Sequence, residues 1–230
     1  KLYDFDLNVK GGHLTGYRVD KDEVFNRLAL YEKDIDGLYG VATEFTLAVG
    51  DGNHSLATAQ AHWNEIKKNL TPEERENHPA RYALCELENL HDEGIVFEPI
   101  HRVVFGVDNE KLVKALKDNI CGGGNLEVVW GDNKQMIPCN PIGAECIAEV
   151  QKVIDEYIAE SGGVVDYIHG TEHLLSVAKE KNGVAIFMPT IQKNELFQYV
   201  VDHGNLSRKS FSMGEAEEKR YYYECHKIVK

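Results

Sequence analysis

The sequence predicts an α/β fold of the mixed α+β kind, in which helices cover a mixed β-sheet. In the last third, short apolar segments typical of strands alternate with segments of helical spacing, at residues 164–168, 172–179, 184–188 and 195–201. The chain has 230 residues, and 43% of them are hydrophobic, which is enough to bury a core without disulfides. We expect one compact unit over residues 1–230, or two lobes over about 1–105 and 106–230.

The N-terminal elements are predicted from local patterns. Alternating apolar residues indicate strands at residues 2–7 and 14–19, joined by a glycine-containing turn. Asp20 comes directly before a helical pattern and is expected to cap that helix. The apolar run at residues 45–49 predicts a short buried strand. After it, the spacing predicts a helix whose core face carries Leu56, Ala59, Trp63 and Ile66.

The middle of the chain predicts further strands and helices. Residues 82–87 and 100–104 have strand composition, and Asp108 is placed to cap the helix that follows them. A strand at residues 126–130 is followed by a proline-bearing loop. Two more helices are expected, over residues 144–158 and 214–230.

The net charge and the hydropathy of the chain restrict the classes of molecule that it can bind. Thirty-eight acidic and 25 basic residues give a net charge of −13, which repels phosphate backbones and disfavours nucleic-acid binding. No apolar run approaches the roughly 18 residues that cross a bilayer, and no signal-peptide pattern is present. We therefore expect a cytoplasmic protein without membrane partners, which binds small anionic molecules. Both a monomer and a homo-oligomer are compatible with the sequence.

The five cysteines are widely scattered and form no Cys-x-x-Cys pair. This arrangement indicates reduced thiols and argues against a structural zinc site, so no metal-binding residue is assigned. The chain begins without Met, at a predicted strand, which indicates the C-terminal part of a longer protein.

The most informative segment is the loop between the strand at residues 45–49 and the next helix, Gly50-Asp51-Gly52-Asn53-His54-Ser55. A helix start leaves backbone amides unpaired and its dipole favours negative charge, so this loop is typical of a phosphate or carboxylate cradle. Gly50 and Gly52 allow a ligand to approach the backbone closely. Asp51 is a candidate to hold a cation or accept a hydroxyl proton, and Asn53 and His54 are candidates to hydrogen-bond the ligand. The alternative is that Asp51 or Asn53 only caps the helix and the glycines form a tight turn.

Three cationic residues are further candidates, because a bound phosphate needs charge compensation. Arg102 follows His101 on a predicted strand, and Arg208 and Lys209 form a short positive segment near the C-terminus. Each also has a simpler account, as an edge pair with solvated head groups or as a solvated basic turn.

Five segments together resemble the motifs of a known protein family: Leu2-Tyr3-Asp4-Phe5, Val49-Gly50-Asp51-Gly52-Asn53-His54-Ser55, His101-Arg102-Val103-Val104, Val165-Asp166-Tyr167-Ile168-His169-Gly170 and Ser207-Arg208-Lys209-Ser210. With them the chain resembles, over nearly all its length, the bacterial and archaeal family numbered 1015 among the domains of unknown function. Many relatives carry Asp-Gly-His-His-Arg at the loop, so Asp51, Gly52 and His54 match, and Asn53 and Ser55 depart. That motif is in turn similar to the Asp-Gly-His-x-Arg loop of the superfamily of ParB-like proteins, sulfiredoxin and free-serine kinases, which bind nucleotide phosphates there.

The loop and the resemblance together favour a small-molecule phosphotransferase of a kinase-like type, acting on a hydroxyl-bearing metabolite such as an amino acid. The cofactor would be a nucleotide or another phosphate donor with Mg²⁺. The catalytic residues would be Asp51 and His54, and the phosphate would be bound by Gly50, Gly52, Asn53, Ser55, Arg102, Arg208 and Lys209. Because Ser55 replaces the strongest phosphate donor of the motif, the alternative is a non-catalytic nucleotide- or metabolite-sensing protein. A ParB-like DNA-binding function is disfavoured by the net charge of −13.

Overall fold

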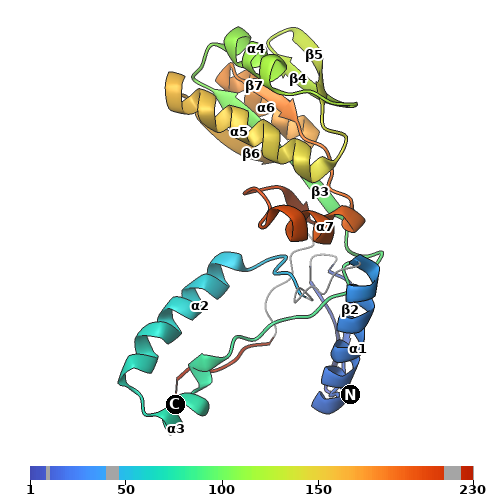
Figure 1. The fold of residues 1–230 in the computed structure, drawn as a ribbon, viewed down its shortest axis with the longest axis vertical. Coiled ribbons are helices and arrows are strands. Elements are labelled where there is room, and N and C mark those ends of the chain that lie inside the picture. The colour runs from blue at the N-terminus through green and yellow to red at the C-terminus, as the bar shows by residue number, and fades with distance from the viewer. Residues whose placement is uncertain (9–10, 40–46, 215–223, 230) are drawn as a thin grey trace. The chain divides into compact units, whose positions relative to one another are not determined.

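The computed structural model describes residues 1–8, 11–39, 47–214 and 224–229. These residues divide into two compact units, whose elements are labelled in Figure 1. The first contains Lys1–Asn89 with the C-terminal residues 224–229, and the second runs from Leu90 to residue 214. Each helix in the described ranges is too short or too polar to cross a lipid bilayer.

A hairpin and two helices make up most of the first unit. β1 (Tyr3–Asp6) pairs antiparallel with β2 (His13–Gly16), which confirms the predicted hairpin. α1 (Lys21–Tyr39) is capped by Asp20, as predicted, because its carboxylate accepts two first-turn amides at 2.9 and 3.3 Å. α2 (Asn53–Ile66) is the helix predicted after the glycine-rich loop.

Short helical elements follow α2. A 3-10 turn, η1 (Lys67–Asn69), leads into α3 (Pro72–Glu76), and a second, η2 (Pro79–Arg81), comes after it. α3 begins with reciprocal capping bonds: the Glu74 amide donates to Thr71 Oγ1 at 3.3 Å, and the Thr71 amide donates to the Glu74 carboxylate at 2.9 Å.

Two strands predicted for this unit are wrong within the described residues. Residues 82–87 form neither helix nor strand, and their apolar side chains are exposed. Of the strand predicted at residues 45–49, the first two residues lie outside the described ranges, and Leu47 and Val49 are 57% and 50% exposed in irregular structure. A strand pattern forms a strand only where a neighbouring strand can pair with it, and no such neighbour is described here.

The predicted core face of α2 is partly buried only at the C-terminal end of the helix. Leu56 and Ala59 are exposed, and Trp63 and Ile66 are half-buried. The helix predicted over residues 214–230 lies mostly outside the described ranges, and residues 224–229 are not helical.

The second unit is built on a sheet with the strand order β5–β4–β7–β3–β6, in which β8 also pairs with β3. The strands are β3 (Phe97–Phe105), β4 (Gly124–Trp130), β5 (Asn133–Cys139), β6 (Val164–His169), β7 (Val184–Phe187) and β8 (Phe211–Met213). The sequence predicts a proline-bearing loop where β5 lies. Pro138 is compatible with β5 because this strand is at the edge of the sheet, where one side needs no amide.

The described pairings of this sheet are all antiparallel, whereas the alternation of strands and helices predicts a mixed or partly parallel sheet. β6 and β7, which α6 (Thr171–Lys181) connects, run in the same direction, but β3 lies between them and is antiparallel to both. β7 separates β3 from β4 in the same way. The predicted class of mixed α and β structure is confirmed, and the correction concerns which strands are neighbours.

Helices cover both faces of the sheet, because side chains alternate between the faces along each strand. α4 (Asn109–Asn119), capped by Asp108 as predicted, α5 (Gly143–Ser161) and α7 (Lys193–His203) share one core with Val104, Val184 and Ile186 (Figure 1). α6 packs on the other face, where Leu174 and Ala178 meet Val103 and Ala185. The two cores make the second unit the well-packed part of the chain.

We expect Val184→Ala to destabilise the second unit by about 2 kcal/mol, from two buried methyl groups at roughly 0.8 kcal/mol each and the cavity that remains. Val184 is fully buried in the first core. Val164→Ala makes the same chemical change on β6, where Val164 is 51% exposed, and should cost less than about 0.5 kcal/mol. Urea unfolding followed by far-UV circular dichroism measures both values, and equal losses would contradict this description of the core.

Candidate functional site

The loop at residues 50–55 is exposed along its length and leads directly into α2. Gly52 is the N-cap residue and has a φ of 76°, in the left-handed region that other residues adopt with strain. A Cβ at Gly52 would meet nothing within 4 Å. Glycine is therefore required here by the backbone conformation and not by a lack of space.

The side chains of the loop hold its backbone and leave the helix start open. Asp51 Oδ1 accepts the Gly52 amide at 2.7 Å, and Asn53 Nδ2 donates to the Val49 carbonyl at 3.3 Å. No side chain caps α2. The alternative that Asp51 or Asn53 serves only as a helix cap is therefore not what the structure shows.

The first turn of α2 presents unpaired hydrogen-bond donors. The Leu56 amide donates to the Gly52 carbonyl at 2.9 Å and is the first amide bonded within the helix. The amides of Asn53, His54 and Ser55 have no acceptor among the described residues. The turn itself has no acidic residue, and the adjacent carboxylate of Asp51 is bonded to the Gly52 amide and not to these three amides. This arrangement suits an anion.

Arg102, Arg208 and Lys209 belong to the second unit, and the structure brings the two arginines together around Tyr167. The centre of the Tyr167 ring lies 5.0 Å from the guanidinium carbon of Arg102 and 5.7 Å from that of Arg208. Arg102 and Tyr167 are direct partners in the β3–β6 register. Arg102 is fully buried, whereas Arg208 and Lys209 are exposed.

A closed ring of hydrogen bonds joins the two arginines. Arg102 Nε donates to Gln151 Oε1 at 3.2 Å, and Gln151 Nε2 donates to Asp155 Oδ1 at 2.9 Å. Arg208 Nη2 donates to the same Asp155 oxygen at 3.0 Å. Arg102 Nη2 donates to the backbone carbonyl of Arg208 at 3.2 Å, which completes the ring. The position of the Arg208 segment therefore depends on Arg102.

The two arginines have different electrostatic surroundings. Burial lowers the pKa of Arg102 to about 10, so this side chain is still a cation at neutral pH. Tyr167 and Asp155 raise the pKa of Arg208. The enclosed Arg102 guanidinium is suited to hold the segment in place, and the exposed Arg208 and Lys209 are the cations that solvent can reach. Phosphate binding by these three residues stays a prediction.

Three residues around the two arginines were not among the candidates from the sequence: Tyr167, Gln151 and Asp155. Tyr167 lies in a segment that carries the family resemblance, and a correct β3–β6 register would have placed it opposite Arg102. Gln151 and Asp155 have only the i, i+4 spacing of helix neighbours, which does not distinguish them from other polar residues of α5. Across the described ranges, no group of three or more His, Cys, Asp or Glu side chains is placed to hold a metal ion.

His101 precedes Arg102 on β3 and is also buried. Its Nδ1 accepts the Met188 amide at 3.1 Å, and its ring lies 5.4 Å from that of Phe187. An imidazole that accepts at Nδ1 is neutral, with its proton on Nε2. Burial lowers the pKa of His101, and the charges of Arg102 and His169 lower it further.

The comparison with protein-family models agrees with the family resemblance found in the sequence, which runs through nearly the whole chain. The family model "Protein of unknown function (DUF1015)" matches residues 1–227. No curated protein matches. An ADP complex of a mutant free serine kinase is similar to this chain at 14% identity and a TM-score of 0.49, with 86% of this chain and 82% of that chain covered. An AMP complex of a free serine kinase is similar at 16% identity and a TM-score of 0.45, with 86% and 81% covered.

We expect acidification to destabilise the second unit through His101. The unfolded chain takes up a proton near pH 6.5, while the folded chain resists protonation because its His101 pKa is lowered. The contribution of the neutral ring is therefore full above pH 6.5 and is lost as the pH falls from there toward the lowered folded pKa. His101→Asn keeps an acceptor for the Met188 amide without titrating, so its stability should fall less over this range. Urea unfolding between about pH 5 and 8 compares the two slopes, and identical slopes would refute the assignment.

Proposed function

The chain belongs to the DUF1015 family, as its motifs predicted, and we propose that it is a small-molecule phosphotransferase whose loop at residues 50–55 holds a phosphate group. One observation carries this proposal: the start of α2 has no side-chain cap and offers three consecutive amides, those of Asn53, His54 and Ser55. Amides in this position bind phosphate oxygens and gain from the helix dipole.

Asp51 and His54 are the proposed catalytic residues. One oxygen of Asp51 is used by the Gly52 amide, and the other is available to orient the acceptor hydroxyl. His54 is exposed in the first turn of α2 and would hydrogen-bond the transferred phosphoryl group. The donor is a nucleotide or another phosphorylated compound, and the acceptor is a hydroxyl-bearing metabolite.

Mg²⁺ binding is the alternative role of the free oxygen of Asp51. This ion is commonly bound through one or two carboxylates and the phosphates of the substrate, so a single exposed carboxylate beside a phosphate cradle is sufficient. Bound there, Mg²⁺ would offset the negative charge of the donor phosphates.

The two departures from the family motif have different consequences. Asn53 tethers the loop to the Val49 carbonyl, which is a structural role that a side-chain amide performs well. Ser55 cannot supply the bidentate contact of the arginine found in many relatives. Arg208 and Lys209 are exposed cations of the second unit, and phosphate binding by these two residues is a separate part of the proposal.

We expect His54→Ala to weaken binding of the phosphate donor about tenfold or more, because a hydrogen bond to a charged group is lost. His62→Ala is the matched control, since His62 is also exposed on α2 but two turns further along. Calorimetry with ATP, ADP and pyrophosphate measures donor binding, and phosphorus NMR follows transfer to serine and other hydroxyl metabolites. If none of these donors binds and no transfer occurs, the proposal fails.

The second candidate is a non-catalytic sensor of a nucleotide or another phosphorylated metabolite, which Ser55 favours because the chain lacks the strongest donor of the motif. The same measurements separate the candidates. Binding without any product supports the sensor. Product formation that Asp51→Ala abolishes supports the enzyme.

Arg208→Ala tests the prediction that this exposed cation binds phosphate. The change should weaken donor binding by about 1.5–3 kcal/mol, the usual value of a hydrogen bond to a charged group. Arg27→Ala, which changes an exposed arginine of α1, should have no effect. An Arg208→Ala variant that binds the donor like wild type would remove Arg208 from the phosphate-binding residues.

A further inference from the structure

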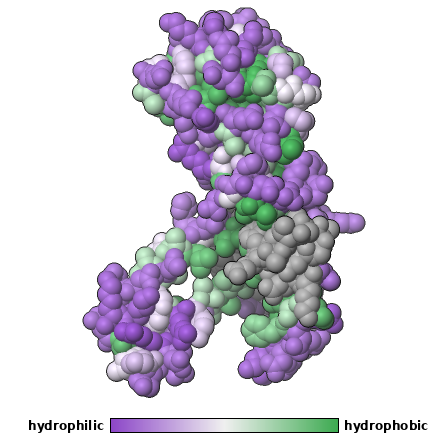
Figure 2. Space-filling model, viewed as in Figure 1, coloured by the Kyte–Doolittle hydropathy of each residue, from purple (hydrophilic) through white to green (hydrophobic). Residues whose placement is uncertain are grey.

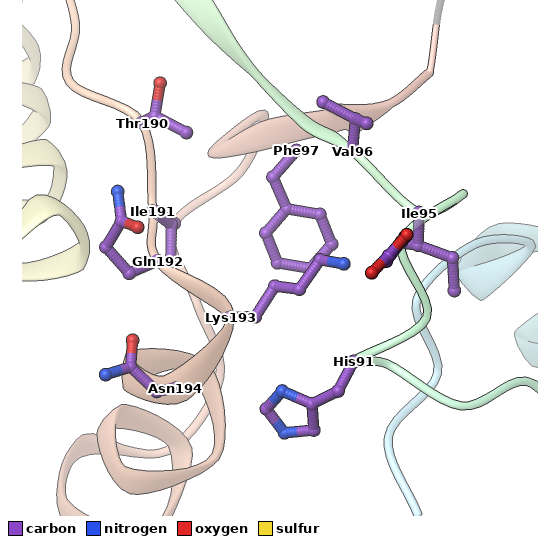
Figure 3. Close-up of a pocket in the computed structure, with 10 residues that line it drawn as sticks. His91, Ile95, Val96, Phe97, Thr190, Ile191, Gln192, Lys193 and Asn194 are labelled. Carbon is purple, nitrogen blue, oxygen red and sulfur yellow. The ribbon is translucent and has the colours of Figure 1, made fainter.

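A cavity of about 510 Å³ lies within the second unit, between residues 91–97 and the start of α7 (Figure 3). Figure 3 shows Lys193 extending from the start of α7 toward Phe97, the first residue of β3, and His91 on the segment that precedes this strand. Phe97 and Ile191 line it and are 6% and 1% exposed, so the cavity has an apolar floor. The cavity is open to solvent, and its volume lies within the range of small-metabolite sites.

Lys193 and Glu93 place opposite charges on this cavity. Lys193 Nζ donates to the Asp92 carbonyl at 2.6 Å, which holds the ammonium group in place. Within the described part of the chain, neither Lys193 nor Glu93 has an ion-pair partner. Two unpaired charges of opposite sign on one cavity are complementary to a ligand that carries both.

The start of α7 adds backbone hydrogen-bond donors beside Lys193. The Gln192 amide donates to Glu195 Oε2 at 3.3 Å, and the Glu195 amide donates to the Gln192 carbonyl at 3.0 Å. The amides of Lys193 and Asn194 have no acceptor in the described ranges. The carboxylate of Glu195, the acidic residue of this turn, is used by the Gln192 amide, so the Lys193 ammonium group and the two amides remain to bind the carboxylate of a ligand.

We propose that this cavity binds a small zwitterion with one carboxylate and one ammonium group, the chemistry of a free amino acid. The carboxylate binds at Lys193 and the start of α7, the ammonium group binds at Glu93, and the remainder lies on Phe97. A simple anion would leave Glu93 without a partner of opposite charge, and a simple cation would leave Lys193 with only the Asp92 carbonyl. The inference does not depend on the phosphotransferase proposal, because no residue of the cavity belongs to the loop at residues 50–55.

Calorimetry with the full chain, without any nucleotide, tests the inference. The proteinogenic L-amino acids are screened, and the tightest binder is compared with its N-acetyl derivative and its C-terminal amide. Each derivative lacks one of the two charges, so each should bind at least about tenfold more weakly.

Two variants assign the charges to their residues. Glu93→Gln should lose the preference for the amino acid over its N-acetyl derivative, and Lys193→Met should lose the preference over its amide. Glu172→Gln and Lys179→Met, on α6 in the same unit, are the matched controls and should bind as the wild type does. The screen contains no nucleotide, so a failure of the phosphate loop to bind its donor does not change the outcome for this cavity. The inference is overturned if no amino acid binds, if both derivatives bind as tightly as the parent, or if the two variants behave like their controls.

Discussion

The buried guanidinium of Arg102 is the constraint around which much of the second unit is arranged. A charge on a fully buried strand residue is tolerated only when its donors are bonded, and Arg102 lacks a direct carboxylate partner in the described ranges. Its donors instead reach α5 through Gln151, the backbone of β3 through the Ile100 carbonyl, and the C-terminal segment through the Arg208 carbonyl. The Tyr167 ring on β6 covers it. One side chain thereby joins four parts of the chain, which explains why the segment before β8 is held against the sheet.

The helices and strands of the second unit were largely predictable from the sequence, whereas the order of the strands in its sheet was not. Strands and helices with strong periodicity, such as the one begun by Asp108, appear where expected. The neighbour relations depend on β7, which inserts between β3 and β4, and no local pattern specifies that insertion. Local patterns also failed at residues 82–87, since their apolar alternation has no strand beside it. Strand formation requires partners distant in sequence, and only the folded chain supplies them.

For the candidate site, the sequence located the loop, and the structure showed what its side chains do. A glycine before a helical pattern predicts a positive φ, and Gly52 has it. The sequence left open whether Asp51 and Asn53 cap the helix. The structure shows that both side chains bond to the loop backbone instead. The cavity beside α7 was not predicted, because Glu93 and Lys193 are 100 positions apart and neither lies in a motif.

An acidic protein can still bind anions if the donors act at short range. Charges beyond a Debye length of about 8–10 Å are screened by salt, whereas amides act at hydrogen-bond distance. The first turn of α2 fits this requirement, since it contains no acidic residue. In the second unit, Arg208 already pairs with Asp155 at 3.0 Å, so an anion at Arg208 must compete with that carboxylate. Lys209 forms no ion pair in the described ranges, so an anion can pair with it without displacing a carboxylate. Of the two exposed cations, Lys209 is therefore the one that an anion can recruit at the lower cost in free energy.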